Sequence, residues 1–209
     1  GAFRLPEDVG GLTAAGIMQR SWLKSLRFFE MTERNRTDSA VLNENSPLNF
    51  KTNDGDGLFV VVDLGRETAG HLEFSVETDE DCKMTIGWGE HLVDLRVRTE
   101  IDGRNFAADF TLKKGKNRFT DYLRRIGCRY LCAFVYAKSV KIGELTVREA
   151  SYPFKKPKKD FGDTFVNKIY EVGRRTLELC AHEHYEDCPW REQALYGMDS
   201  RNQMLFGYG

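Results

Sequence analysis

The sequence lacks any apolar run long enough to cross a bilayer. Its longest purely apolar stretch, around Phe59 to Val62, is far shorter than the roughly 20 residues that a membrane-spanning helix needs. The first residues show no basic stretch followed by an apolar one, so a secretory signal is not visible. Because the chain begins with Gly1 rather than methionine, the question of a signal removed earlier stays open. We predict no contact with a membrane.

An excess of charge of one sign is also missing. Lysine and arginine number 31 against 32 aspartate and glutamate residues, which gives a formal net charge of -1. A basic stretch at 155–159 lacks the interleaved aromatic residues of a nucleic-acid-binding surface. We therefore predict no nucleic-acid partner. The share of hydrophobic residues, 41%, and of charged residues, 30%, is typical of an ordinary globular protein.

Close cysteine pairs are absent. The five cysteines are an odd number, and no CxxC motif suggests a zinc site or a redox centre. We predict free and mostly buried thiols, which favours a reducing compartment, the cytoplasm rather than the periplasm. The cysteines are Cys82, Cys128, Cys132, Cys180 and Cys188.

Motifs for metals and cofactors are missing as well. His182 and His184 lie near two glutamates, but the HExxH pattern is not present. On a helix, positions i and i+2 point in nearly opposite directions, so the two imidazoles could not share an ion there. The glycines at 65 and 87–89 lack the lysine and the strand-to-helix setting of nucleotide-binding loops. We predict no metal and no cofactor.

From Leu58 onward, apolar residues recur at every second position. Leu72, Phe74 and Val76 alternate with polar residues. Three later segments repeat this period: 82–88, 126–136 and 142–147. Turn-forming breaks separate these runs, at 79–81, 102–103 and 114–116. Residues 58–152 are therefore expected to form a mainly β domain, an antiparallel β-sandwich.

The flanking segments differ from this pattern. Residues 1–57 mix apolar residues at unclear spacing with a polar stretch, and are expected to form an N-terminal strand or short helix and then a loop. The basic, proline-punctuated stretch 153–162 is predicted to be a linker, because each proline disfavours helix in the residue before it. Residues 163–209 have a helical period and are predicted to form the first helices of a second domain.

Two helices are expected in that last segment. Asp163 or Thr164 can cap the first, which is expected to reach about Tyr185. The second is expected to start at Trp190 or Arg191, directly after a proline, and to carry the chain to its end. Two helices joined by a short turn form a helical hairpin rather than a complete domain.

The second predicted helix and the turn before it concentrate carboxylates and aromatic side chains. If Glu192 and Asp199 are both helical, seven residues bring them to one face, with Cα atoms roughly 10 Å apart. Asp187 would project from the turn, and Tyr196 falls near the same stripe. Sugar hydrolysis requires such a group, because one protonated carboxyl donates to the glycosidic oxygen while others bind ring hydroxyls. A solvated helix face with incidental charges would show the same spacing.

The motif Asp187-Cys188-Pro189-x-Arg191-Glu192, with Asp199 seven residues after the glutamate, resembles the signature of the α-L-rhamnosidase family. Three upstream segments are similar to the sandwich domain of that family. They are 62–70, a glycine-bearing strand start, 87–90, a strand end, and 127–130, which is similar to a GFRY segment. The resemblance covers about 58–203.

The resemblance implies that the sandwich leads into an (α/α)6 barrel of the six-hairpin type, and that hydrolysis of terminal α-L-rhamnose inverts the anomeric centre. By position, Glu192 resembles the general acid, whereas Asp187 and Asp199 resemble carboxylates that bind the sugar and tune the acid. The expected substrate-binding residues are Arg191, which would orient a carboxylate, Trp190, which would stack at the edge of the site, and Tyr196.

The general base of an inverting enzyme lies far downstream in that family, beyond Gly209. The resemblance therefore implies a truncated N-terminal fragment that is inactive by itself. The chain also departs from many members, which have a polar residue at Trp190 and a Gly-Trp pair at Leu195-Tyr196. These departures affect the expected sugar specificity.

Two other classes of protein fit the same residues. The sandwich could be a carbohydrate-binding or structural module, with exposed aromatics such as Trp88 binding glycan, or the chain could be an interaction domain without a sugar site. The helices carry an apolar face that further barrel helices would cover. This face predicts self-association of the chain or packing on the sandwich.

Overall fold

A computed structural model describes residues 2–4, 30–33, 45, 47–51, 56–93, 96–155 and 159–207. The strand or short helix and the loop expected in residues 1–57 lie largely outside the described residues. The sandwich and the helices predicted from Leu58 onward fall within them, apart from short gaps.

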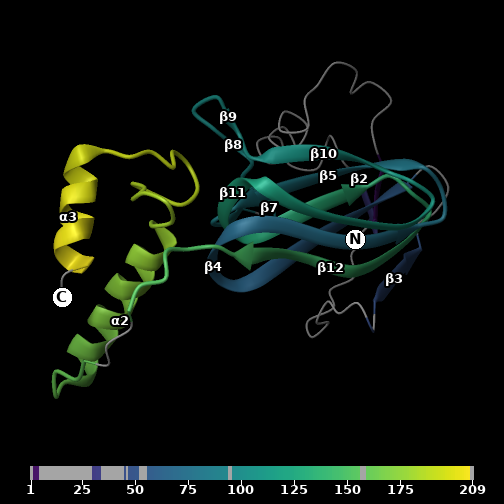
Figure 1. Ribbon diagram of the computed structural model, residues 1–209. Helices are drawn as coiled ribbons and strands as arrows, with labels where there is room; N and C mark the ends of the chain where they lie inside the picture. The colour runs from purple at the N-terminus through teal and green to yellow at the C-terminus, as the bar shows by residue number, and fades with distance from the viewer. Residues whose placement is uncertain are drawn as a thin grey trace.

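The described chain is mainly β and ends in two helices, which lie beside one end of the sandwich (Figure 1). The strands are β1 (Ala2–Arg4), β2 (Glu30–Glu33), β3 (Leu48–Lys51), β4 (Asp56–Thr78), β5 (Cys82–Gly89), β6 (Leu92–Val93), β7 (Arg96–Val97), β8 (Glu100–Ile101), β9 (Arg104–Asn105), β10 (Ala107–Leu112), β11 (Gly115–Val135) and β12 (Ser139–Glu149). The helices are α2 (Thr164–Leu179) and α3 (Gly197–Gly207). The predicted fold class, an antiparallel β-sandwich followed by helices, is confirmed.

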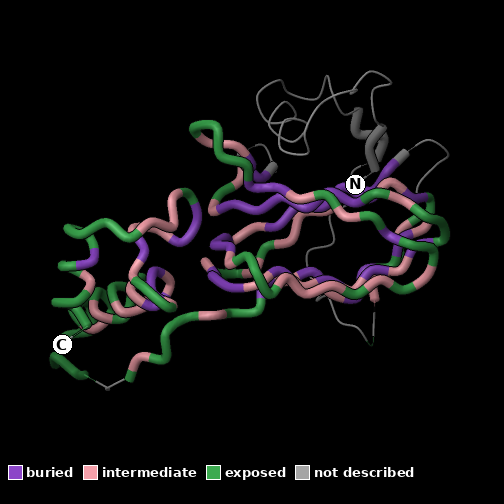
Figure 2. Tube along the Cα trace, turned by 45° about the horizontal axis from the view of Figure 1, so that its top comes forward, coloured by how far each residue is buried: buried purple, intermediate pink, exposed green. Residues whose placement is uncertain are grey.

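The sandwich is built on one long, bent hairpin. Strands β4 and β11 are 23 and 21 residues long and pair antiparallel along most of their length. The half of β11 at 130–135 also pairs with β5, which pairs with β10, whereas the half of β4 at 70–78 pairs with β12. Each long strand therefore contributes its two halves to different layers, and Figure 2 shows these layers one above the other.

The bend is braced by a pair of charged residues. The guanidinium of Arg129 in β11 lies 3.0 Å from each carboxylate oxygen of Asp63 in β4, and its hydrogen bond lowers the pKa of Asp63. The same carboxylate accepts the N–H of Gly65 at 2.8 Å. Gly65 has a φ of 81°, a left-handed conformation that favours glycine. The register of the hairpin also shifts here, between Cys128 and Tyr130.

The hydrophobic core lies between the two layers. The predicted alternation at Leu72, Phe74 and Val76 is confirmed, because all three are buried while their neighbours are not. Phe74 meets Phe110 edge-on at 5.1 Å between ring centroids and stacks on Phe119 at 5.4 Å. Full burial of a side chain of this size contributes roughly 1.5–3 kcal/mol. Other buried members of the core are Met84, Ile86, Leu131, Val135, Val140, Ile142 and Leu145.

Helix α2 begins where the sequence predicts and ends earlier. The carboxylate of Asp163 accepts the N–H groups of Phe165 at 2.7 Å and Val166 at 3.0 Å, so the predicted cap is confirmed. The helix ends at Leu179, however, and the prediction that it reaches about Tyr185 is wrong. The reason is tertiary, because the carbonyl of Leu179 accepts a hydrogen bond from a sandwich arginine instead of continuing the helix.

Helix α3 begins later than predicted. The sequence favours a start at Trp190 or Arg191, but the helix starts at Gly197. Gln193 has a φ of 53°, which interrupts any helix at that position. Residues 187–194 therefore form a loop, and the prediction that Glu192 shares a helical face with a residue seven positions later is wrong.

The helical end is joined to the sandwich by close backbone packing. A Cβ atom added at Gly127 of β11 would lie 2.1 Å from the carbonyl oxygen of Pro189. A Cβ added at Gly89 of β5 would lie 3.2 Å from the ring of Trp190. Glycine at these two positions leaves room for the 187–194 loop to approach the sandwich end.

Two further expectations concern the thiols and the membrane. None of the five cysteines, all within the described residues, forms a disulfide, and Cys128, Cys132 and Cys180 are buried while Cys82 and Cys188 are half-buried, as predicted. Among the described residues, no helix combines the length and apolar character needed to span a bilayer.

Adding a methyl group at Gly127 tests the joint between the loop and the sandwich. We expect Gly127→Ala to lower the free energy of unfolding by about 1–3 kcal/mol, because a crowded site must shift its neighbours. Gly173→Ala is the matched control, since a Cβ there meets open space in α2 and should stabilise by about 0.5–1 kcal/mol. Urea denaturation measures both. Equal stability of the two variants would contradict the packing described here.

Candidate active site

The candidate site is the loop 187–194, which is part of the segment that connects α2 to α3. Its ends are tied together by Asp187, whose N–H donates to the Ala194 carbonyl and whose carboxylate accepts the Ala194 N–H, both at 2.9 Å. The amide of Gln193 donates to the carbonyls of Pro189, at 2.8 Å, and Arg125, at 3.2 Å. The loop is thus closed on itself and fixed to β11.

The carboxylate of Asp187 carries charge at neutral pH. Partial burial raises its pKa, but the hydrogen bonds from the backbone N–H of Ala194 and from Cys188 outweigh burial, so the pKa lies below its usual range. Asp187 is therefore a fixed anion that orders the loop. This structural task is compatible with the sugar-binding role that the resemblance implies.

Glu192 lies at the outer side of the loop, between two arginines. Its Oε1 lies 3.1 Å from Nη2 of Arg191 and 3.6 Å from Nη1 of Arg104, and its side chain is 21% exposed. Its backbone N–H donates to Sγ of Cys188 at 3.3 Å. Arg104 belongs to β9 of the sandwich and also donates to the carbonyl of Arg191 at 3.1 Å. The sandwich therefore contributes a cation to the surroundings of the candidate acid.

Tyr196 joins this group at the far end of the loop. Its hydroxyl is hydrogen-bonded to Glu192, and this bond and the negative charge of Glu192 raise the pKa of the phenol. Asp187 adds to the same effect. Tyr196 is about half exposed, so its ring and its hydroxyl are accessible from outside.

Asp199 does not share a helical face with Glu192, because only Asp199 lies in α3. It lies in the first turn of α3, where a carboxylate interacts favourably with the helix dipole. Within the described part of the chain its carboxylate has no hydrogen-bond or ion-pair partner, and the residue is exposed. The structure thus groups Asp187, Arg191, Glu192 and Tyr196, and among the described residues no hydrogen bond or ion pair joins Asp199 to them.

The two tryptophans with expected sugar contacts are both buried. Trp190, expected to stack at the edge of the site, is 5% exposed and packs against Phe106, at 5.0 Å between ring centroids, and His91, at 5.7 Å. Trp88 is 3% exposed and lies under the guanidinium of Arg124, at 4.5 Å. The expectation of stacking for Trp190 is therefore corrected: its ring anchors the loop in the sandwich core.

A buried ion pair behind the loop was not predicted. Nη1 of Arg125 lies 2.6 Å from Oε2 of Glu186, and these side chains are 9% and 3% exposed. Arg125 also donates to the carbonyls of Ala150 and Leu179, each at 2.9 Å. The sequence offers no local signal for this pair, because 61 residues separate its members.

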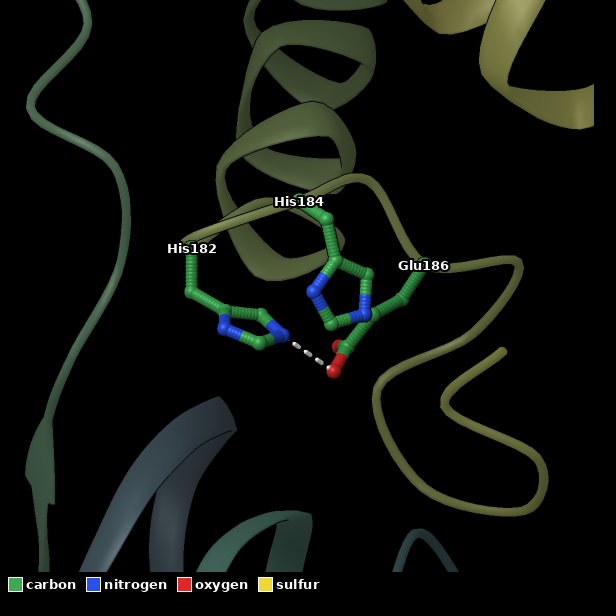
Figure 3. A group of neighbouring side chains, drawn as sticks. All are labelled: His182, His184 and Glu186. Atoms are coloured by element: carbon green, nitrogen blue, oxygen red, sulfur yellow. Dashed lines mark hydrogen bonds and ion pairs between the residues drawn. The ribbon is translucent and has the colours of Figure 1, made fainter. Parts of the chain in front are cut away.

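Glu186 of this pair and two neighbouring histidines form a group that could hold a metal ion. Figure 3 shows His182, His184 and Glu186 directed toward one another, and their donor atoms lie within 4.8 Å. The sequence argument against a shared ion assumed a helix. These residues instead form a turn closed by pairing of Ala181 with Tyr185, which places both imidazoles on one side.

Two glutamates, Glu67 and Glu90, interact at the bend of the sandwich. Burial and the negative charge of Glu90 raise the pKa of Glu67 to about 8, while Arg175 and Arg129 oppose this shift. Burial also raises the pKa of Glu90. Oε1 of Glu67 is buried without a hydrogen-bond partner. This carboxyl is therefore more stable as the protonated acid than an ordinary glutamate.

The fold and the site define a class. A β-sandwich that carries a carboxylate-bearing loop and a helical pair at one end is a glycoside hydrolase-like fragment. No protein-family model and no curated protein matches the chain.

Solved structures give a more particular likeness. The chain is similar to the GH78 family rhamnosidase of Bacillus sp. GL1, with 26% identity and a TM-score of 0.68 over 76% of this chain. It is similar in fold to the α-L-rhamnosidase of Dictyoglumus thermophilum, with 17% identity and a TM-score of 0.52 over 70% of this chain. It spans 17% of the length of each of them. The resemblance to α-L-rhamnosidases that the sequence indicates is confirmed.

The raised pKa of Glu67 makes stability depend on pH. The pKa of this carboxyl rises from 4.5 in the unfolded chain to about 8 in the folded one. Its contribution to folding stability is therefore fully present below pH 4.5 and is lost as the pH rises toward about 8. We expect Glu67→Gln to remove this pH-dependent loss of stability. The difference in stability between the variant and the parent should therefore shift in favour of the variant as the pH rises from about 5 to about 9.

Thermal unfolding of both proteins across this range measures the difference. Glu183→Gln, which changes an exposed glutamate, is the control and should follow the parent at every pH. If Glu67→Gln and the parent show the same pH dependence, Glu67 does not retain its proton in the folded state.

Proposed function

We propose that this chain is the N-terminal fragment of an inverting glycoside hydrolase that removes terminal α-L-rhamnose from glycans or glycosides. The single observation that carries the proposal is the motif 187–192, which lies in a partly buried loop at the junction of a rhamnosidase-like sandwich and a helical pair. The fragment itself is proposed to be inactive, because inversion needs a second carboxylate on the opposite face of the sugar.

Glu192 is the proposed general acid. Its carboxylate is partly exposed, it lies beside the hydroxyl of Tyr196, and the loop that carries it is fixed at both ends. A general acid must hold a proton when the substrate arrives. Arg191 and Arg104 both lie beside the carboxylate of Glu192, so we propose that sugar hydroxyls or further protein groups contact at least one of these arginines in the complete site.

The other proposed site residues have supporting tasks. Asp187, as an ordered anion, and Asp199, as an exposed one, are the proposed acceptors for sugar hydroxyls. Arg191 and Tyr196 are proposed to contact the substrate from the outer side of the loop. Trp190 supports the site from behind by holding the loop in the sandwich.

The alternative of a glycan-binding module receives less support from the described residues. Such modules present exposed aromatic rings to the flat faces of sugars, whereas Trp88 and Trp190 are both buried. Phe165 and Phe206 are exposed, but they lie on the helical end and not on the sandwich that such a module would use.

Replacing Glu192 tests the catalytic proposal in the longest parent protein that contains this chain. We expect Glu192→Gln to lower kcat for an alkyl α-L-rhamnoside by about 100-fold or more, because a general acid contributes 10²–10⁴-fold. The leaving group should be an alcohol, since a nitrophenolate departs without protonation. The assay measures release of rhamnose.

Glu183→Gln serves as the control, because Glu183 is exposed and outside the proposed site. The 209-residue chain is assayed beside the parent and is expected to release no rhamnose. Full activity of Glu192→Gln would remove Glu192 from the role of acid, and an inactive parent would remove rhamnose as the substrate.

The apolar side chains of the helical end lead to a prediction about association. Phe165, Ile169 and Val172 on α2 are 70%, 57% and 59% exposed, and Phe206 on α3 is 78% exposed. We propose that two copies of the chain associate through these residues, because apolar patches of this kind tend to be buried. Sedimentation velocity over a range of concentrations is expected to show a dimer or larger species.

Val172→Ser should shift this equilibrium toward the monomer. Leu123→Ser is the matched control, because Leu123 is 98% exposed on the sandwich, in β11, and its change should leave association unaltered. A chain that sediments as a monomer at every concentration would refute the proposal.

A further inference from the structure

A compact turn after α2 places two imidazoles beside a buried carboxylate. The N–H of His182 donates to the carbonyl of His184 at 3.1 Å, and the N–H of Glu186 donates to the carbonyl of Cys180 at 2.8 Å. The ring centroids of the two histidines lie 4.4 Å apart, and Figure 3 shows both rings near the carboxylate of Glu186. The backbone of the turn thus fixes which side chains meet.

The donor atoms are spaced for a single ion. Nε2 of His182 lies 2.6 Å from Oε1 of Glu186, and a ring nitrogen of His184 completes a group within 4.8 Å. Zinc bonds of about 2.0–2.2 Å in a tetrahedron put neighbouring donors roughly 3.4 Å apart. Small side-chain rotations would therefore bring the three donors to this separation, with the ion replacing the hydrogen bond between His182 and Glu186.

The carboxylate is already oriented for this purpose. Oε2 of Glu186 is held by Arg125 at 2.6 Å, which leaves Oε1 directed at the imidazoles. Ligating carboxylates in metal sites are themselves hydrogen-bonded in this way. The arginine charge weakens binding of a cation, so we expect the site to bind less tightly than one with anionic neighbours alone.

We propose that His182, His184 and Glu186 bind one divalent cation of the borderline type, Zn²⁺, with one coordination position open. Imidazole and carboxylate donors suit this class of ion, and two histidines with one glutamate are a ligand set of open rather than closed zinc sites. His184 is exposed, so an ion can reach the group from solvent. Its three ligands are not among the proposed sugar-binding residues, although Glu186 directly precedes Asp187, and its occupancy can be measured without any substrate.

The test uses the 209-residue chain after treatment with a chelator, and Zn²⁺ or Co²⁺ as the probe. Isothermal titration calorimetry with Zn²⁺ is expected to show one equivalent bound per chain. His184→Ala, which changes an exposed residue, and His182→Ala should each weaken binding by about tenfold or more. His71→Ala is the control, because His71 lies on β4 and contacts the carbonyl of Arg124 instead.

The Co²⁺ form separates this site from a thiol site. A nitrogen and oxygen ligand set gives weak visible bands, whereas thiolate ligands add strong near-ultraviolet absorption. Cys188→Ser should leave binding unchanged. The proposal is overturned if binding does not saturate near one equivalent, if thiolate absorption appears, or if His184→Ala binds as tightly as the parent while circular dichroism shows both folded.

Discussion

The guanidinium of Arg125 joins the sandwich to everything that follows it. It holds the end of β12 through Ala150, the end of α2 through Leu179 and the turn through Glu186, while its own carbonyl accepts the amide of Gln193. A buried cation is tolerated only when its donors are satisfied, and removal of one partner from such a pair costs about 3–5 kcal/mol. The position of the candidate site therefore depends on this arginine.

The contact between the loop and the sandwich also explains why the separate segments that resemble α-L-rhamnosidases occur together in one sequence. The segments 62–70, 87–90 and 127–130 meet at one end of the sandwich, where Tyr130 pairs with Asp63 and with Gly89. Pro189 and Trp190 pack directly against glycines of two of these segments. The rhamnosidase-like motif and the three upstream segments are thus parts of one packing surface. They are linked by steric fit and not by a shared chemical role.

Sequence reasoning succeeded where the controlling interactions are local. Strand alternation reports a half-buried sheet, and the Asp163 cap acts within three residues, so both were predicted correctly. It failed from Leu179 to Gly197, where helical periodicity continues in the sequence but a distant arginine ends the helix and a left-handed Gln193 reverses the chain. His182 and His184, which a helix would direct apart, are brought together for the same reason, because the helix has already ended before them. Arg104, 88 positions before Glu192, carries no signal that sequence spacing could reveal.

The loop has consequences for how a catalytic group could be held here. The 187–194 loop is pinned at its ends by Asp187 and in its middle by the buried ring of Trp190, so the backbone that carries Glu192 is held in place. Rigid attachment of this kind is what general acid catalysis needs, because a displacement of about 1 Å can cost two orders of magnitude in rate. In the proposed site the sandwich would support this loop through the core packing of Trp190 and through Arg104.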